Sequence, residues 1–191
     1  PLREVFQRLS GAGYLSIEPN RGAVVSAMDL MVMRRFFQTA PIIYASISRL
    51  AAEQSTPTRI KALKSAQHRF LQAKEQGDAA QTALMNHIFH DCIGQMAANP
   101  YLMPSLNRLL IDHTRMSHTF YRARTATDGA RIEKAAHQHD LLIDALAAHD
   151  AELAVEITLD HWALSRDQIE KYVWPDPLPD DAAALTRGDA E

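Results

Sequence analysis

Apolar positions recur at helical spacing along most of the chain and predict a helical domain that follows a short mixed arm. Residues 2–10 place apolar side chains three and four apart, and two glycines end this first helix. Residues 14–18 and 23–27 are short extended runs on either side of the turn-forming stretch PNRG, which predicts a β-hairpin. From residue 29 onward every periodic segment has the helical period.

Turn and capping residues divide the helical part into six segments. Thr56 followed by Pro57 starts one helix, Gly77 ends it, and Asp78 and Asp150 are suited to cap two others. Because the links are short, successive helices are expected to pack antiparallel. The predicted fold class is therefore mainly α, an antiparallel six-helix bundle preceded by a helix and a hairpin. The predicted helices cover roughly residues 28–53, 57–76, 79–98, 101–125, 130–148 and 151–173.

Composition narrows the class of protein. The 191 residues carry a net charge of −3 and are 47% hydrophobic, so the chain can bury a sizeable core and is not a uniformly basic nucleic-acid binder. A local basic patch is compatible with these numbers. The single cysteine, Cys92, excludes an internal disulfide and a cysteine-rich zinc module, and it fits a cytoplasmic location. No apolar run reaches the roughly 18 residues that a membrane span needs, so no membrane partner is expected.

Neither end of the chain has the pattern of a complete folded unit. The sequence opens inside an amphipathic pattern with no helix-start signal before it, and we interpret it as part of a longer protein. Residues 174–191 are rich in proline and aspartate and are predicted to be a flexible tail.

Three of the nine histidines are predicted to point into the bundle. His90 shares a helical face with small and apolar residues and lies one turn after Asn86. His139 and His161 each lie in register with apolar positions of their own helices. Three imidazoles and one oxygen suit zinc, nickel, iron or copper with coordination positions left open. Helical phase does not show that the three histidines meet in space. It is therefore equally compatible with three separate histidines that only form hydrogen bonds in the core.

The first 26 residues resemble the end of the winged helix-turn-helix domain of GntR-type transcription regulators. In that family the recognition helix reads Pro, Leu or Val, Arg, Glu and ends in Arg-Leu, and the wing carries an Asn or Arg before Arg-Gly. Phe6 stands where the family usually has Leu. The matching residues are Pro1, Arg3, Glu4, Leu9, Gly13, Tyr14, Asn20, Arg21, Gly22 and Val25.

The rest of the chain, to about residue 173, is similar to the helical FCD-type effector domain of the FadR branch of that family. The family pattern has Asp or Asn four residues before a His that follows Phe, which corresponds here to Asn86 and Phe89-His90. The stretch NPYL, which begins at Asn99, follows, and then His139 and His161 stand where the family has its last two histidines. The resemblance therefore selects the same three histidines as helical phase.

This resemblance implies a metal and an acid in the core of the bundle. It makes Asn86, His90, His139 and His161 the ligands of a divalent metal ion, zinc or nickel, whose open positions take a small carboxylic-acid effector. Family members usually carry Asp where this chain has Asn86, and a neutral amide is expected to hold a dication more weakly. The candidates to hold the rest of the effector are Arg34, Arg115 and His118. Arg34 is included because Gln38 replaces the Glu with which the family's arginine pairs.

The resemblance also implies operator DNA and a homodimer as partners. Arg3 and Gln7 lie on the exposed face of the recognition helix and are predicted to meet the major groove. Arg21 at the wing tip is predicted to contact phosphate or the minor groove. The expected domains are the end of a winged helix-turn-helix domain at 1–26, an FCD-type domain at 27–173 and the tail at 174–191.

Two other functions remain open at this stage. A metal-free effector module of the same regulator class would use the three histidines for packing and hydrogen bonding only. A metalloenzyme with three histidine ligands is the second alternative, but the inward faces offer no further carboxylate or base that would activate a water. We therefore predict a regulator and not an enzyme.

Overall fold

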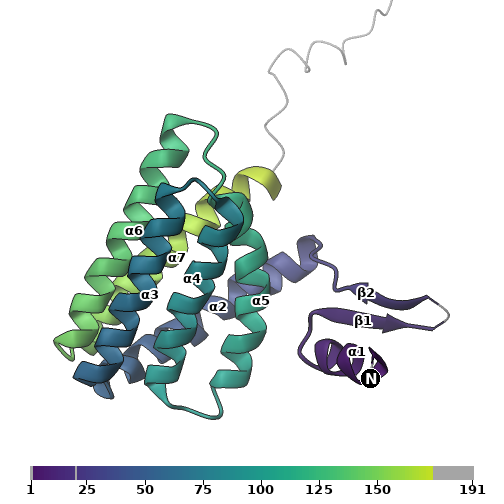
Figure 1. Ribbon diagram of the computed structural model, residues 1–191, viewed down its shortest axis with the longest axis horizontal. Coiled ribbons are helices and arrows are strands. Elements are labelled where there is room, and N and C mark those ends of the chain that lie inside the picture. Colours follow the sequence, from purple (N-terminus) through teal and green to yellow (C-terminus); the bar gives the residue numbers. More distant parts are fainter. Residues whose placement is uncertain (1, 20, 174–191) are drawn as a thin grey trace, which may run out of the picture.

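A computed structural model describes residues 2–19 and 21–173, and this part of the chain forms a helical bundle with a small arm at one side (Figure 1). The arm consists of helix α1 (Leu2–Gly11) and a hairpin of β1 (Leu15–Glu18) and β2 (Gly22–Val25). The two strands are antiparallel, with Leu15 opposite Val25 and Glu18 opposite Gly22. The bundle consists of α2 (Leu30–Glu53), α3 (Pro57–Glu75), α4 (Ala79–Ala97), α5 (Met103–Phe120), α6 (Ala126–Ala147) and α7 (Ala151–Val173).

The predicted six-helix bundle and hairpin are confirmed, and the expected caps start the helices. The expected cap Thr56 accepts a hydrogen bond from a backbone N–H in the first turn of α3, and Asp29, which was not among the expected caps, does the same for α2. Asp78 accepts hydrogen bonds from the N–H groups of Ala80 and Gln81 at the start of α4. These bonds satisfy donors that have no partner within the helix.

The predicted boundary between the fourth and fifth bundle helices is wrong in one respect. The stretch around Gly129 was expected to separate them, but α5 already ends at Phe120 and α6 begins at Ala126. The reason is a capping box, in which the Thr125 hydroxyl accepts from the N–H of Asp128 and the Asp128 carboxylate accepts from the N–H of Thr125. This reciprocal pair starts the helix before the glycine, so Gly129 lies inside α6.

Helix α4 lies in the middle of the bundle and carries the predicted metal-binding stretch. It packs against α2, α3 and α5, while α7 packs against α2 and α6. The core that these helices share is apolar, and its largest fully buried side chains include Phe70, Phe89, Leu106, Leu142 and Leu146. A polar side chain on the inner face of α4, α6 or α7 is therefore removed from water.

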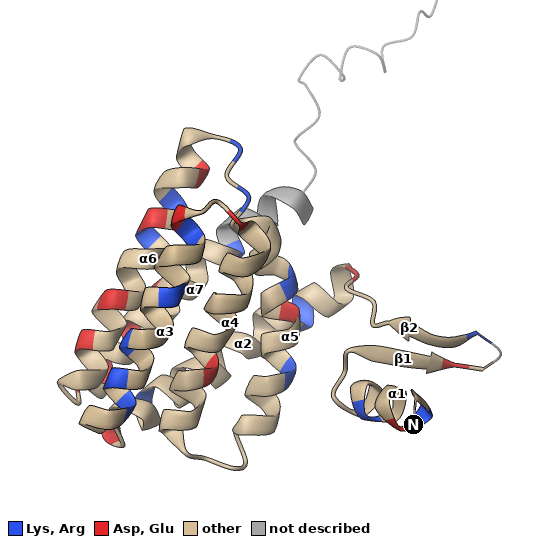
Figure 2. Ribbon diagram, viewed as in Figure 1, with Lys and Arg blue, Asp and Glu red and all other residues tan. Residues whose placement is uncertain are grey.

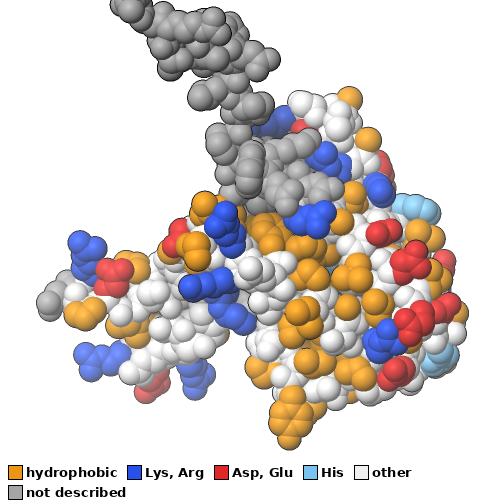
Figure 3. Space-filling model, turned by 180° about the vertical axis from the view of Figure 1, so that it is seen from behind, with side chains coloured by type: hydrophobic (Ala, Val, Ile, Leu, Met, Phe, Trp, Pro, Cys, Tyr) orange, Lys and Arg blue, Asp and Glu red, His pale blue; other side chains and the backbone are white. Residues whose placement is uncertain are grey.

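Charged residues are spread along the helices of the bundle and also occur on the arm, in α1 and near the turn of the hairpin (Figure 2). Seen from behind, hydrophobic side chains gather across the middle of the bundle, and most charged groups lie around them (Figure 3). No described helix is long and apolar enough to cross a membrane. The predicted tail at 174–191 lies outside the described residues. The large exposed hydrophobic residues of the bundle helices and links are Leu30, Met31, Ile42, Leu84, Tyr101, Leu141, Leu153 and Leu159.

Candidate metal centre

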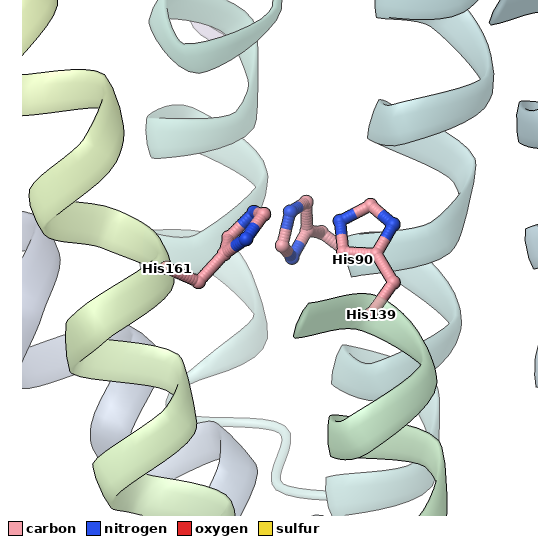
Figure 4. Close-up of side chains that lie close together, drawn as sticks. All are labelled: His90, His139 and His161. Carbon is pink, nitrogen blue, oxygen red and sulfur yellow. The ribbon is translucent and has the colours of Figure 1, made fainter. Parts of the chain in front are cut away.

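The three predicted histidines meet in the core. His90 comes from α4, His139 from α6 and His161 from α7, and their rings lie next to one another between the helices (Figure 4). One ring nitrogen of each lies within 4.8 Å of the corresponding nitrogens of the other two. All three side chains are buried, His139 completely. This arrangement could hold a metal ion.

Two glutamines fix which nitrogen of the histidines faces the centre. His139 Nδ1 donates to Gln67 Oε1 at 3.0 Å, and His161 Nδ1 donates to Gln138 Oε1 at 3.2 Å. An amide oxygen only accepts hydrogen bonds, so in both histidines Nδ1 carries the proton and Nε2 carries a lone pair. Gln67 is held in this orientation because its Nε2 donates to Ala136 O. Buried partners of this kind orient metal-binding histidines in known sites.

Burial keeps these imidazoles neutral. It lowers the pKa of His161 to about 4, and it places the pKa values of His90 and His139 well below the ordinary value, with neighbouring histidines lowering them further. Neutral imidazole is the form that binds a metal. Near neutral pH, a metal ion that binds these histidines therefore does not have to displace a proton from them.

The donor set fits a divalent metal ion of the zinc or nickel type. Among the buried side-chain nitrogens and oxygens of the described residues, only two have no hydrogen-bond partner, and these are Nε2 of His90 and Nε2 of His139. A buried donor or acceptor without a partner costs about 1–3 kcal/mol. A cation held by the three histidines would give both atoms a partner.

Asn86 is buried one turn before His90 on the same face of α4. Its Oδ1 accepts a hydrogen bond of 3.0 Å from the hydroxyl of Tyr121. Burial raises the pKa of Tyr121, so the phenol stays protonated and remains a donor. Because a carbonyl oxygen has two lone pairs, Asn86 Oδ1 keeps one lone pair for a metal.

A cavity of about 20 Å³ is lined by two of the three histidines, His90 and His161. This is room for about one water molecule. Two polar pairs face it: the Tyr44 hydroxyl lies 2.8 Å from His113 Nδ1, and the Ser48 hydroxyl lies 2.7 Å from the Thr158 hydroxyl. Burial lowers the pKa of His113 to about 3, so this ring is also neutral. The cavity is lined by Tyr44, Ile47, Ser48, His90, Ile93, His113, Leu142, Thr158, His161 and Trp162.

The three residues predicted to hold the rest of the effector lie elsewhere. Arg34 is exposed on α2. Arg115 is partly buried on α5 and pairs with Asp112 at 3.4 Å. His118 lines an open groove near the α5–α6 link. None of the three lines the cavity, and their contact with an effector stays a prediction.

The predicted DNA-contacting residues are exposed on the arm. Arg3 and Gln7 lie on α1, and Arg21 lies in the turn between the strands, 3.5 Å from Glu18. Their contact with DNA stays a prediction.

Seven polar residues of the site were not predicted from the sequence, namely Gln67, Gln138, Tyr121, Tyr44, His113, Ser48 and Thr158. Helical phase could have found Gln67, because it is in register with Ile60, Leu63 and Phe70 on a buried face. No sequence signal pairs it with His139, which lies on another helix.

The FCD domain family matches residues 42–164, which is more than half of the chain. The solved structure of E. coli McbR/YncC is 24% identical, with a TM-score of 0.70, and the match covers 87% of this chain and 83% of that one. A structure from work on Lar, which controls the expression of the Listeria monocytogenes agr system and mediates virulence, is 19% identical, with a TM-score of 0.66 over 92% of this chain and 80% of that one.

Streptococcus agalactiae GntR is 16% identical, with a TM-score of 0.59, over 87% of this chain and 80% of that one. No curated protein matches the sequence. At these identities the solved structures establish a shared fold, and the family match establishes the domain. The chain therefore belongs to the FCD domain family, and it has the fold of GntR-type transcription regulators.

Proposed function

We propose that this protein is a ligand-responsive, DNA-binding transcription regulator in which a small carboxylic acid binds at a divalent metal ion among His90, His139 and His161. The FCD domain and the fold support the regulator class. The metal and the acid are supported by the chemistry of the buried site. A divalent ion there would supply positive charge and open positions for an acid oxygen.

One observation carries the metal site: two buried imidazole nitrogens, His90 Nε2 and His139 Nε2, lack hydrogen-bond partners in a cluster where the three histidines bring one ring nitrogen each within 4.8 Å of the others. A packed core satisfies its polar atoms. The glutamines that hold Nδ1 of His139 and His161 leave the opposite nitrogens of these rings for a ligand. A metal-free use of the histidines would leave the two unpartnered nitrogens unexplained.

Binding an acid requires the bundle to rearrange. The cavity next to the histidines has a volume of about 20 Å³, which is too small for a carboxylic acid. Trp162 is one wall of this cavity, and its ring lies 6.4 Å from that of Phe36 and 5.1 Å from that of Phe37. A ligand that displaces Trp162 therefore pushes on the first turns of α2.

Helix α2 connects the cavity to the arm. Tyr44, Ile47 and Ser48 line the cavity, and only residues 26–29 separate α2 from the end of the hairpin (Figure 1). A second link runs through α5, where buried Asp112 holds Arg108 at 2.8 Å and the Arg108 side chain packs against Gly13 of the arm. Ligand binding would thus favour one placement of the arm, which is a population shift.

DNA binding and dimerisation complete the proposal. Arg3, Gln7 and Arg21 are exposed on the arm, where they can reach the groove and the phosphates of operator DNA. A homodimer would bring two arms to the two halves of an operator. The exposed hydrophobic side chains on the bundle are the surface that such a dimer could bury.

The test is a thermal melt of the purified protein as isolated, after EDTA, and after re-addition of Zn²⁺ or Ni²⁺, each with and without small carboxylic acids. Metal content is measured on the same samples by mass spectrometry. At about 100 times its dissociation constant a ligand adds about 2.7 kcal/mol of stability, which is several degrees for this size. We expect acids to raise Tm only in the metal-loaded protein.

A His139→Ala variant should lose both the metal and the response to acids. His137→Ala is the matched control, because His137 is exposed on the same helix. If neither metal nor acid changes the melt of the wild-type protein, the metal-dependent proposal is wrong and the metal-free effector module takes its place.

A further inference from the structure

The cavity beside the histidines is polar but carries no formal charge. Among the described residues that line it, none is Arg, Lys, Asp or Glu. The two arginines predicted to bind the effector, Arg34 and Arg115, do not line it, and Arg115 pairs with Asp112. The only positive charge that an anion could meet there is a metal ion at the three histidines. A ligand with one carboxylate is neutralised, whereas a second carboxylate would be buried without a counter-charge.

The pair formed by Tyr44 and His113 always keeps one donor for a ligand. A phenol and a neutral imidazole have one hydrogen each, and the 2.8 Å bond between them uses one of the two. If Tyr44 donates to Nδ1, the N–H of His113 Nε2 remains, and if His113 donates, the O–H of Tyr44 remains. Both residues line the cavity and are buried.

The Ser48 and Thr158 hydroxyls form a second pair on the cavity wall. They are 2.7 Å apart, so one hydroxyl hydrogen lies between them and the other remains. Both residues are buried. The remaining wall is apolar, formed by Ile47, Ile93, Leu142 and Trp162.

We infer that Tyr44, His113, Ser48 and Thr158 form a hydrogen-bonding subsite that selects a small monocarboxylic acid with a neutral oxygen substituent and rejects dicarboxylic acids. This inference rests on the proposed function, because the carboxylate of the ligand is placed at the metal. The neutral oxygen, a hydroxyl or a carbonyl, accepts the hydrogen that the Tyr44–His113 pair retains. The apolar wall covers the short carbon chain.

The test measures acid binding by calorimetry to the metal-loaded protein. Acetate and glycolate differ by one hydroxyl, and succinate and succinamate differ only by a charged carboxylate against a neutral amide of the same shape. One added hydrogen bond to a buried donor predicts that glycolate binds about threefold to tenfold more tightly than acetate. Succinate should bind at least about tenfold more weakly than succinamate, since only succinate buries an unpaired charge.

Tyr44→Phe combined with His113→Leu removes both hydrogens of the pair, because either single change leaves the other residue free to donate. It should reduce glycolate affinity to the level of acetate, while metal content, measured separately, stays at the wild-type value. Tyr101→Phe is the control, because Tyr101 is 89% exposed. Tyr44→Phe combined with His113→Met is a second double variant with the same expected loss, so a folding defect in one of them does not end the test.

The outcomes separate the two proposals. If succinate binds as tightly as succinamate, or if glycolate keeps its advantage in both double variants, this inference is wrong and the metal-dependent regulator stands. If neither succinate nor succinamate binds, the inference is judged from the affinities for glycolate and acetate alone. If no acid binds although the metal is present, the effector part of the proposed function fails together with this inference.

Discussion

Gln67 on α3 accepts a hydrogen bond from Nδ1 of His139 on α6, at 3.0 Å, and both side chains are buried. The same amide donates from Nε2 to Ala136 O at 3.1 Å and to Asp140 Oδ1 at 3.0 Å. These two bonds leave Oε1 as the atom that faces His139. The orientation of the histidine therefore depends on a residue 72 positions away in the sequence.

We predict that Gln67→Leu weakens metal binding by about 10–100-fold, because His139 loses the partner that fixes its tautomer and ring orientation. Gln72→Leu on the same helix is the control, since Gln72 is exposed. The measurement is a competition titration with a zinc chelator at pH 7. Wild-type affinity in Gln67→Leu would mean that His139 does not depend on this bond.

Asn86→Asp should change the metal-free and metal-loaded proteins in opposite directions. Without metal, a buried carboxylate with one hydrogen bond, from Tyr121, is expected to lower the free energy of unfolding by about 1–3 kcal/mol. With a dication at the histidines, the added negative charge should raise metal affinity by at least about tenfold. Urea unfolding with EDTA and the chelator titration measure the two effects. An unchanged metal affinity would show that the oxygen of residue 86 does not face the ion.

The inward histidines could be predicted from sequence because helical phase is a local property. A buried helix face repeats every three and four residues, so the register of His90 with Ala83, Ile93 and Ala97 is enough to place it inside. The capping residues Thr56 and Asp78 are equally local signals, and both start the helices that they were expected to start.

The partners of those histidines could not be predicted, because they depend on which helices are neighbours. The Tyr44–His113 pair joins residues 69 positions apart on α2 and α5, and only the packing of the bundle brings them together. Arg34 was chosen because its neighbourhood departs from a family pattern, and that pattern did not indicate that Arg34 lies on an exposed face of its helix. Sequence patterns indicate which side of a helix is buried, but they do not indicate what that side touches.

Stability of the metal-free protein should fall as the pH falls below about 6.5. Burial lowers the pKa of His161 to about 4 and that of His113 to about 3, from an ordinary value of 6.5. Between these values the unfolded chain binds protons that the folded chain does not, so the free energy of unfolding rises with pH. The contribution is complete above pH 6.5 and is lost toward pH 4 for His161 and pH 3 for His113, at about 1.4 kcal/mol per pH unit for each group.

Urea unfolding with EDTA at pH 7.5, 6 and 5 measures this slope. His113→Asn should reduce it, while His137→Asn, at an exposed position, should leave it unchanged. A free energy of unfolding that is flat between pH 7.5 and 5 would contradict the assignment of these rings as neutral and buried.

Substitution by alanine at Gly94 and at Gly129 is predicted to change the free energy of unfolding in opposite directions. A Cβ at Gly94 on α4 would collide with the Leu106 side chain on α5 and approach Met103 Sδ to 3.1 Å. Leu106 is completely buried and has little room to move. Gly94→Ala should therefore lower the free energy of unfolding by about 1–3 kcal/mol, through overpacking between these helices.

At Gly129 a Cβ meets nothing within 4 Å, and the residue lies inside α6. Gly129→Ala should raise the free energy of unfolding by about 0.5–1 kcal/mol, because alanine loses less backbone freedom on forming a helix. At about 2–4 °C per kcal/mol for a chain of this size, thermal melts resolve both shifts. Equal shifts of the same sign would mean that α4 and α5 are packed less closely than the contact between Gly94 and Leu106 indicates. Helix α4, which carries His90, would then be held less firmly than the metal site requires.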